Sequence, residues 1–168
     1  MMKWIGAILI VAGCGGVGFA MASAYRAEEG ALEGICRALE YMRCELSYQM
    51  TPLPQLCRKT ANLLTGRLKE TFEQMALELE RQVAPDAASC MRAVLVRVDL
   101  PESVQAVLNR MGTGLGCFDL PGQLRELEGC QQEAKNRRAY LAEHRHNRIR
   151  GYQTLGLCAG AALAILFL

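Results

Sequence analysis

The chain has 168 residues, of which 51% are hydrophobic, and a formal net charge of +2. The 19 basic and 17 acidic side chains nearly balance, which argues against a nucleic-acid-binding protein, since such proteins carry a strongly basic surface. The length suits one domain that buries a core of its own.

The chain begins with an apolar run. Between Trp4 and Ala24 only Ser23 is polar. A helix of this length rises roughly 31 Å, which matches the hydrocarbon thickness of a bilayer. Residues 1–25 are therefore predicted to form a transmembrane helix. Two alternatives stay open, namely a secretory signal cleaved after Ala24 and a lipoprotein signal acylated at Cys14.

The middle of the chain, residues 26–150, is predicted to be an all-α bundle of about five to six helices. The first helix is expected from about Ala27 to Met50. Apolar residues recur along it at spacings of three and four. They are Leu32, Ile35, Cys36, Leu39, Met42 and Leu46. Thr51 and Pro52 are expected as N-cap and first residue of the next helix.

Two further helices have clear apolar sides. The second helix is predicted to bury Leu53, Leu56, Cys57, Leu63 and Leu64. The third, from about Arg67 to Gln82, is predicted to bury Leu68, Phe72, Met75, Leu79 and Val83. Asp86 is expected to cap a fourth helix over 87–98. A fifth helix is expected to begin after residues 99–101 and to end near Met111.

Three glycines separate the fifth helix from the last one. Gly112, Gly114 and Gly116 are predicted to form a flexible hinge or a helix C-cap. Asp119 is expected to cap a long helix, because residues 131–150 contain neither Gly nor Pro. The apolar side chains of this helix are Leu124, Leu127, Ala134 and Leu141.

The chain ends with a second apolar run, Leu155 to Leu168, that has no polar side chain. Residues 151–168 would span roughly 27 Å as a helix and are predicted to form a second transmembrane helix. A buried core helix is the alternative, although such a helix normally keeps a polar face. Basic side chains cluster before this run, at Lys135, Arg137, Arg138, Arg145, Arg148 and Arg150. The positive-inside rule then predicts a cytoplasmic middle domain.

Both apolar runs carry small residues four positions apart. Gly16 and Ala20 lie in the first run, and Gly156 and Gly160 lie in the second. Small residues at this spacing allow helices to approach closely in lipid. We predict these four positions as transmembrane packing sites, with the general abundance of small residues in membrane helices as the alternative.

The eight cysteines form no C-x-x-C pair. Cys14 and Cys158 lie in the apolar runs, and the other six are well separated. They are Cys36, Cys44, Cys57, Cys90, Cys117 and Cys130. We interpret them as reduced residues that act as small hydrophobes. A secreted or lipid-anchored helical protein with a disulfide framework is the alternative.

No motif in the sequence predicts catalysis. P-loop, G-x-G-x-x-G and G-x-S-x-G patterns are absent, and we predict no catalytic, cofactor-binding or metal site. His144 and His146 have no acidic or cysteine partner at helical spacing, so they are interpreted as part of a basic face. A small membrane enzyme that uses His144 or the carboxylates is a further alternative. Four glutamates on the third helix are candidate partner-binding residues instead, with ordinary solubility as the alternative. They are Glu70, Glu73, Glu78 and Glu80.

Three blocks of the sequence carry a family resemblance. Residues 45–53 have the pattern E-x-x-Y-x-x-T-P-L, and residues 152–160 have the pattern Y-x-x-L-G-x-x-x-G. Residues 111–124 match L-G-x-x-L-G-x-x-D-x-x-x-Q-L, except that Met111 replaces the first leucine. In chain order, and with an apolar run at each end of the sequence, the three blocks resemble the stage III sporulation protein AB family. The many cysteines and the glycine-rich first run depart from that family.

The resemblance implies a role in endospore formation, in the mother-cell membrane that faces the forespore. The family belongs to the channel complex between the two cells. Its soluble domain is similar to a helical cytoplasmic domain of the type II secretion F-family platform protein. By that analogy the chain would couple a secretion-type ATPase, stage III sporulation protein AA, to other channel-complex proteins. A homo-oligomer stays open, and no cofactor is implied.

Overall fold

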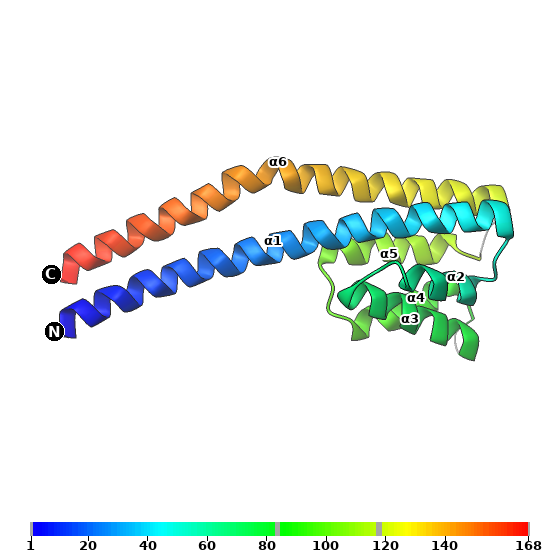
Figure 1. Ribbon diagram of the computed structural model, residues 1–168, viewed down its shortest axis with the longest axis horizontal. Helices are drawn as coiled ribbons and strands as arrows, with labels where there is room; N and C mark the ends of the chain where they lie inside the picture. The colour runs from blue at the N-terminus through cyan, green and yellow to red at the C-terminus, as the bar shows by residue number, and fades with distance from the viewer. Residues whose placement is uncertain (1, 83–84, 117–118, 168) are drawn as a thin grey trace. The chain divides into compact units, whose positions relative to one another are not determined.

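The computed structural model describes the backbone of residues 2–82, 85–116 and 119–167. It describes the side chains of residues 23–82, 85–116 and 119–143. These residues form six helices, which confirms the all-α prediction (Figure 1). The helices are α1 (Met2–Gln49), α2 (Leu53–Ala61), α3 (Gly66–Arg81), α4 (Ala87–Arg97), α5 (Glu102–Gly114) and α6 (Leu120–Phe167).

The chain divides into two units. Unit 1 contains residues 1–29 and 139–168, and unit 2 contains residues 30–138. The helices α1 and α6 each contribute residues to both units. Unit 2 holds the whole of α2, α3, α4 and α5, and its bounds lie inside the predicted 26–150 domain.

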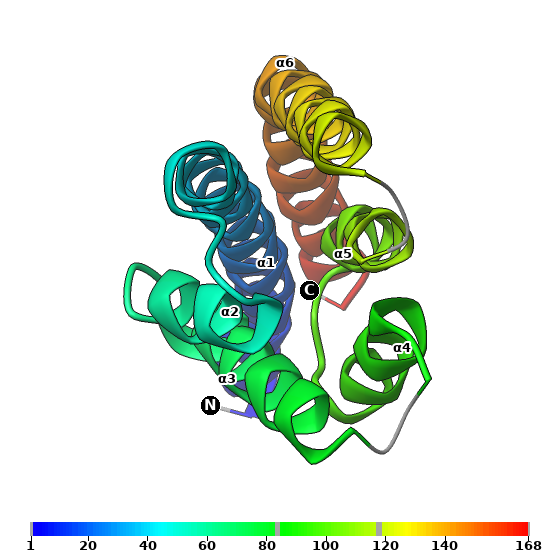
Figure 2. The same cartoon turned by 90° about the vertical axis from the view of Figure 1, so that its right-hand side faces the viewer.

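The six helical segments of unit 2 surround one core in sequence order (Figure 2). α2 packs on α3, α3 on α4, and α4 on α5. Polar contacts connect the remaining neighbours. Arg110 of α5 pairs with Glu126 of α6 at 2.7 Å, and Glu33 of α1 pairs with Arg138 of α6 at 3.2 Å. The first and last segments therefore close a ring.

The apolar stripes predicted from the sequence point into this ring. All six stripe residues of the first predicted helix are buried, and so are Leu68, Phe72 and Met75 of α3. The prediction was wrong for Leu63, whose side chain is 49% exposed. Because α2 ends at Ala61, Leu63 no longer follows the helical phase that places Leu56 inside. Val83 lies outside the described residues.

Two of the three predicted aspartate or threonine caps are confirmed. The carboxylate of Asp86 accepts from the backbone N–H of Ser89 at 2.7 Å, at the start of α4. The carboxylate of Asp119 accepts from the N–H of Gly122 at 3.2 Å, at the start of α6. The Thr51 cap was wrong, because Pro52 occupies the N-cap position of α2 and no side chain caps that helix.

The glycines predicted to be a flexible stretch have two different roles. Gly112 and Gly114 are buried inside α5, where a side chain would collide with neighbouring helices. Gly116 alone has the left-handed conformation of a helix end, with φ of +81°. The prediction of a hinge was therefore wrong for Gly112 and Gly114. Glycine is required at these two positions because the helices pack too closely for a side chain, and not because the backbone turns there.

Between residues 23 and 143, no described helical segment is both long enough and apolar enough to span a bilayer. The first apolar run, apart from Ser23 and Ala24, and the whole second run lie outside that range. The four predicted packing residues, Gly16, Ala20, Gly156 and Gly160, lie outside the described side chains as well.

Candidate interaction surfaces

The four glutamates of α3 do not form one acidic face. Glu78 accepts from Arg97 of α4 at 2.7 Å, and its side chain is only 12% exposed. Glu80 pairs with Arg58 of α2 at 2.8 Å. These two carboxylates therefore connect α3 to its two neighbours in the ring, and their charge is largely compensated within unit 2.

Glu70 and Glu73 differ from that pair because their contacts stay on α3. Glu70 accepts from Gln74 at 3.1 Å, and Glu73 lies 3.7 Å from Lys69. Both are exposed, and at helical spacing they share the outer side of α3 with Leu77, which is 44% exposed. Exposed contacts of this kind contribute little to stability, so these two carboxylates stay available to a partner.

The turn between α1 and α2 is held by a buried carboxylate. Glu45 is 7% exposed, and one of its oxygens accepts from the Thr51 hydroxyl at 3.0 Å and from the Lys59 ammonium. The hydrogen bond from Lys59 is the main reason that the pKa of Glu45 is lowered, and the bond from Thr51 adds to it. The same contact raises the pKa of Lys59. Glu45 and Thr51 of the E-x-x-Y-x-x-T-P-L block thus build the turn itself.

This contact predicts a pH-dependent stability. A carboxylate with a lowered pKa in the folded state contributes stability that is complete above its ordinary pKa of 4.5. That contribution disappears as the pH falls through the lowered value. The melting temperature of the full chain, followed by circular dichroism, should therefore fall less between pH 6 and strong acid in Glu45→Gln than in wild type. Parallel losses in the two proteins would contradict the prediction.

The same turn exposes two large side chains. Tyr48 is 87% exposed and Met50 is 71% exposed. Met50 also has φ of +49°, in the left-handed region that residues with a side chain seldom adopt. Neither residue was predicted as a site. The available signal was Tyr48 itself, an aromatic residue on the solvent side of the first stripe, inside a block that resembles the family.

The second block, residues 111–124, is built into the fold. A Cβ atom added to Gly112 would lie 2.8 Å from Cβ of Met91, so Gly112 allows α5 to approach α4. Leu115 is 1% exposed, Gly116 makes the left-handed turn, and Asp119 caps α6. Every one of these residues has a structural role, so the block supports architecture rather than chemistry.

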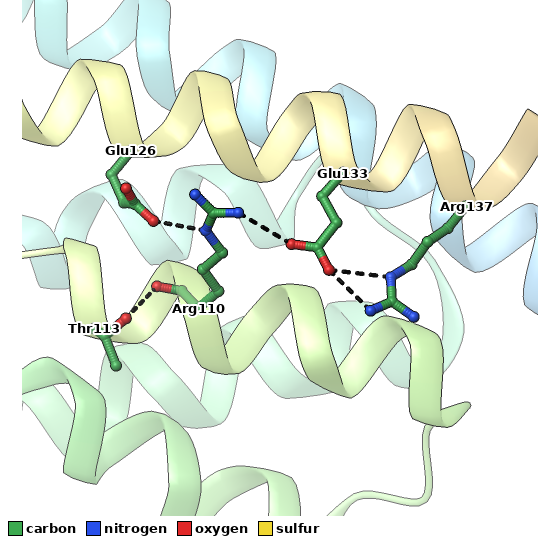
Figure 3. Close-up of polar contacts among 5 residues, drawn as sticks. All are labelled: Arg110, Thr113, Glu126, Glu133 and Arg137. Carbon is green, nitrogen blue, oxygen red and sulfur yellow. Dashed lines mark hydrogen bonds and ion pairs between the residues drawn. The ribbon is translucent and has the colours of Figure 1, made fainter.

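An arginine on α5 bridges two turns of α6 (Figure 3). Nε of Arg110 lies 2.7 Å from a Glu126 oxygen, and its Nη1 lies 3.3 Å from Glu133. Glu133 in turn pairs with Arg137 at 2.9 Å. These contacts raise the pKa of Arg110 and lower the pKa of Glu133. Gly129 makes room for the arginine, because a Cβ there would lie 2.9 Å from its Nη2.

A cavity of about 510 Å³ opens at the end of unit 2 where α1, α3 and α5 terminate and α2, α4 and α6 begin. We call this the turn end. The lining residues are Leu53, Leu79, Gln82, Pro85, Asp86, Ala87, Cys90, Leu115 and Gly116. Leu53 belongs to the first family-like block, and Leu115 and Gly116 belong to the second. The cavity was not predicted, since no local pattern shows that these helix ends converge.

The described cysteines are thiols, as predicted. They are Cys36, Cys44, Cys57, Cys90 and Cys130, and all except Cys44 are buried. Burial raises the pKa of Cys57 to about 12, with a further contribution from Cys90, and raises that of Cys130 to about 11. Thiols with such high pKa values are poor nucleophiles and poor metal ligands.

In the part of the chain with described side chains, no three His, Cys, Asp or Glu residues gather as metal ligands would. His144 and His146, the only histidines in the sequence, lie outside that part.

Comparison with known proteins identifies the family. The family model described as stage III sporulation protein AB matches residues 3–168. The chain belongs to this family. Membership confirms the resemblance carried by the three blocks, and it supports a role in sporulation.

Two similar proteins carry the same description. Stage III sporulation protein AB of Bacillus subtilis (strain 168) is 25% identical over 175 residues, and the match covers all of both chains. A solved structure of a stage III sporulation protein AB has a TM-score of 0.65 at 18% identity, covering 72% of this chain and 98% of the other. The structural likeness supports the helical fold.

Proposed function

We propose that this chain is a non-enzymatic membrane platform of the channel between mother cell and forespore. Helical apolar ends anchor it in the mother-cell membrane that faces the forespore, with unit 2 in the cytoplasm. Unit 2 binds the secretion-type ATPase, stage III sporulation protein AA, and couples it to the other channel-complex proteins.

The observation that carries the proposal is the order of parts along a chain whose family match runs from residue 3 to residue 168. An apolar run of membrane-spanning length precedes the helical unit, and a second apolar run follows it. Two anchors restrict the tilt and reach of the domain between them more than one anchor does. Close control of position is what a platform for a motor protein requires.

The outer side of α3 supports electrostatic attraction of a basic partner surface. Glu70 and Glu73 are exposed there, and among the described residues they pair with Gln74 and Lys69 of the same helix, whereas Glu78 and Glu80 are held by arginines of α4 and α2. Exposed carboxylates at the rim of an interface raise the association rate more than they slow dissociation. We therefore assign Glu70 and Glu73 to attraction of the ATPase.

The test compares binding of the purified ATPase to the detergent-solubilised full chain. Glu70→Lys combined with Glu73→Lys should slow association about tenfold at low salt, and the difference should shrink as salt rises. Glu40→Lys is the matched control, because Glu40 is an exposed glutamate on a different helix, α1. Glu78 and Glu80 are left unchanged, since reversal there would break ion pairs inside unit 2.

Each outcome has a distinct meaning. Failure of the wild-type chain to bind the ATPase would refute the platform proposal. Binding that is unaffected by the double reversal would keep the platform and remove this side of α3 from it. A sporulation assay in a deletion strain gives the cellular readout. A complementing gene truncated before Leu155 should fail to restore spores, and full rescue would contradict the need for a second anchor.

A further inference from the structure

Three features of unit 2 occur at the turn end: a cavity, two exposed large side chains and two non-glycine residues with a positive φ. The cavity of about 510 Å³ opens there. Tyr48 and Met50 are exposed just before Leu53, which lines that cavity. Two residues other than glycine, Met50 and Gln82, have a positive φ in the turns that follow α1 and α3. A left-handed conformation at such residues costs stability, and costs of this kind concentrate at functional sites.

The lining of the cavity indicates what it accepts. Leu53, Leu79 and Leu115 supply apolar walls, and none of the nine lining residues is basic. The carboxylate of Asp86 lies among them, and its hydrogen bonds to Ser89 keep its pKa low, so it is ionised at neutral pH. A cavity of this size and lining suits a large apolar side chain, and the exposed Asp86 carboxylate, which also caps α4, can face a cation beside it.

Tyr48 and Met50, five and three residues before the cavity-lining Leu53, are of the kinds that anchor protein interfaces. Aromatic residues and methionine are enriched in interface cores, and tyrosine is among the residues that contribute most to binding energy. Their support is rigid, because the buried carboxylate of Glu45 holds the turn through Thr51 and Lys59. A rigid anchor loses little conformational entropy when it binds.

We propose that the turn end is the anchoring site for the ATPase, which inserts a large apolar side chain between Met50 and the cavity and places a Lys or Arg against Asp86. This inference rests on the proposed function and deepens it. The outer side of α3 attracts the partner, and the turn end retains it. The two surfaces therefore affect different rate constants, since anchor contacts govern dissociation.

Met50→Gly combined with Tyr48→Ser tests the anchor in the full chain. Glycine adopts the φ of residue 50 without strain, so this variant should unfold at the same or a higher temperature than wild type. Loss of two anchor side chains should nevertheless speed dissociation of the purified ATPase at least tenfold, with little change in association. If this variant keeps the wild-type melting temperature but binds the ATPase more weakly, the two side chains contact the partner and do not stabilise the fold.

Leu79→Trp tests the cavity independently of the exposed pair, because the larger side chain occupies the space that the partner would use. It should also speed dissociation about tenfold, provided that circular dichroism shows the native helix content. Should this variant fail to fold, the Tyr48 and Met50 variant decides alone, because both of its positions are exposed. Val96→Ser is the matched control, since Val96 is 88% exposed but lies in the last turn of α4, whose first turn lines the cavity.

The outcomes separate this inference from the proposed function. Faster dissociation in both variants, with Val96→Ser unchanged, supports the anchor. Wild-type dissociation rates in both variants overturn the anchor and leave the platform in place, and so does an equal effect of Val96→Ser. A wild-type chain that does not bind the ATPase at all overturns both.

Discussion

Replacing Phe72 by alanine is expected to lower the free energy of unfolding by about 3 to 5 kcal/mol. Phe72 is 1% exposed and is the largest of the fully buried side chains in the described core. It lies on α3, which packs against both α2 and α4, so the space left by the ring cannot close by moving one neighbour alone. The lost transfer energy and the remaining cavity therefore both contribute.

Urea unfolding of the full chain in detergent, followed by circular dichroism, measures this effect. Leu77→Ala on the same helix is the control, because Leu77 is 44% exposed and its truncation should cost less than about 1 kcal/mol. Similar losses for the two variants would contradict the position of Phe72 in the core. The slope of the unfolding curve should stay the same, which would show that compactness has not changed.

Replacing Gly112 by alanine is expected to destabilise unit 2 by about 1 to 3 kcal/mol. Alanine normally favours a helix by up to about 1 kcal/mol over glycine, so the expected effect has the opposite sign to helix propensity. The reason is the contact between α5 and α4, where a new Cβ would lie 2.8 Å from Cβ of Met91. Met91 is fully buried and its Cβ cannot rotate away, so the two helices must separate.

Gly30→Ala provides the opposite result from the same chemical change. Gly30 lies in α1, and no atom beyond its chain neighbours and the adjacent backbone of its own helix is within 4 Å of the position that its Cβ would take. The substitution should stabilise the chain by roughly 0.5 to 1 kcal/mol. Thermal unfolding of the two variants side by side is the measurement. Two changes of the same sign would show that propensity, and not packing, decides the effect at Gly112.

The sequence predicted the helices of unit 2 well, because their signals are local. The stripe from Leu32 to Leu46 is buried as predicted, and Asp86 and Asp119 cap the helices that they were assigned to. Aspartate before an apolar periodic segment can satisfy free N–H groups wherever the rest of the chain goes. Such interactions need no knowledge of which helices become neighbours.

The sequence failed where a residue interacts with a distant part of the chain. Thr51 was predicted to cap α2, but its hydroxyl donates to Glu45 of α1. Glu78 and Glu80 were predicted as partner-binding residues, and the sequence did not predict that each pairs with an arginine of another helix. The cavity at the turn end arises in the same way, from helix ends that meet only in the folded chain. Local sequence patterns do not show which residues of other helices become neighbours in the folded chain.

The ring of helices has a consequence for how the chain folds. The pairs α2 with α3 and α4 with α5 join neighbours in sequence, so they can form early as helical hairpins. The contact between α1 and α6 joins residues roughly a hundred positions apart. The entropy lost in closing so long a loop becomes smaller once the helical hairpins have formed and shortened the flexible chain between the two helices. During synthesis, α1 has to wait for α6 to leave the ribosome. Until then its buried stripe stays uncovered on one side, which makes α6 the segment whose arrival completes the fold.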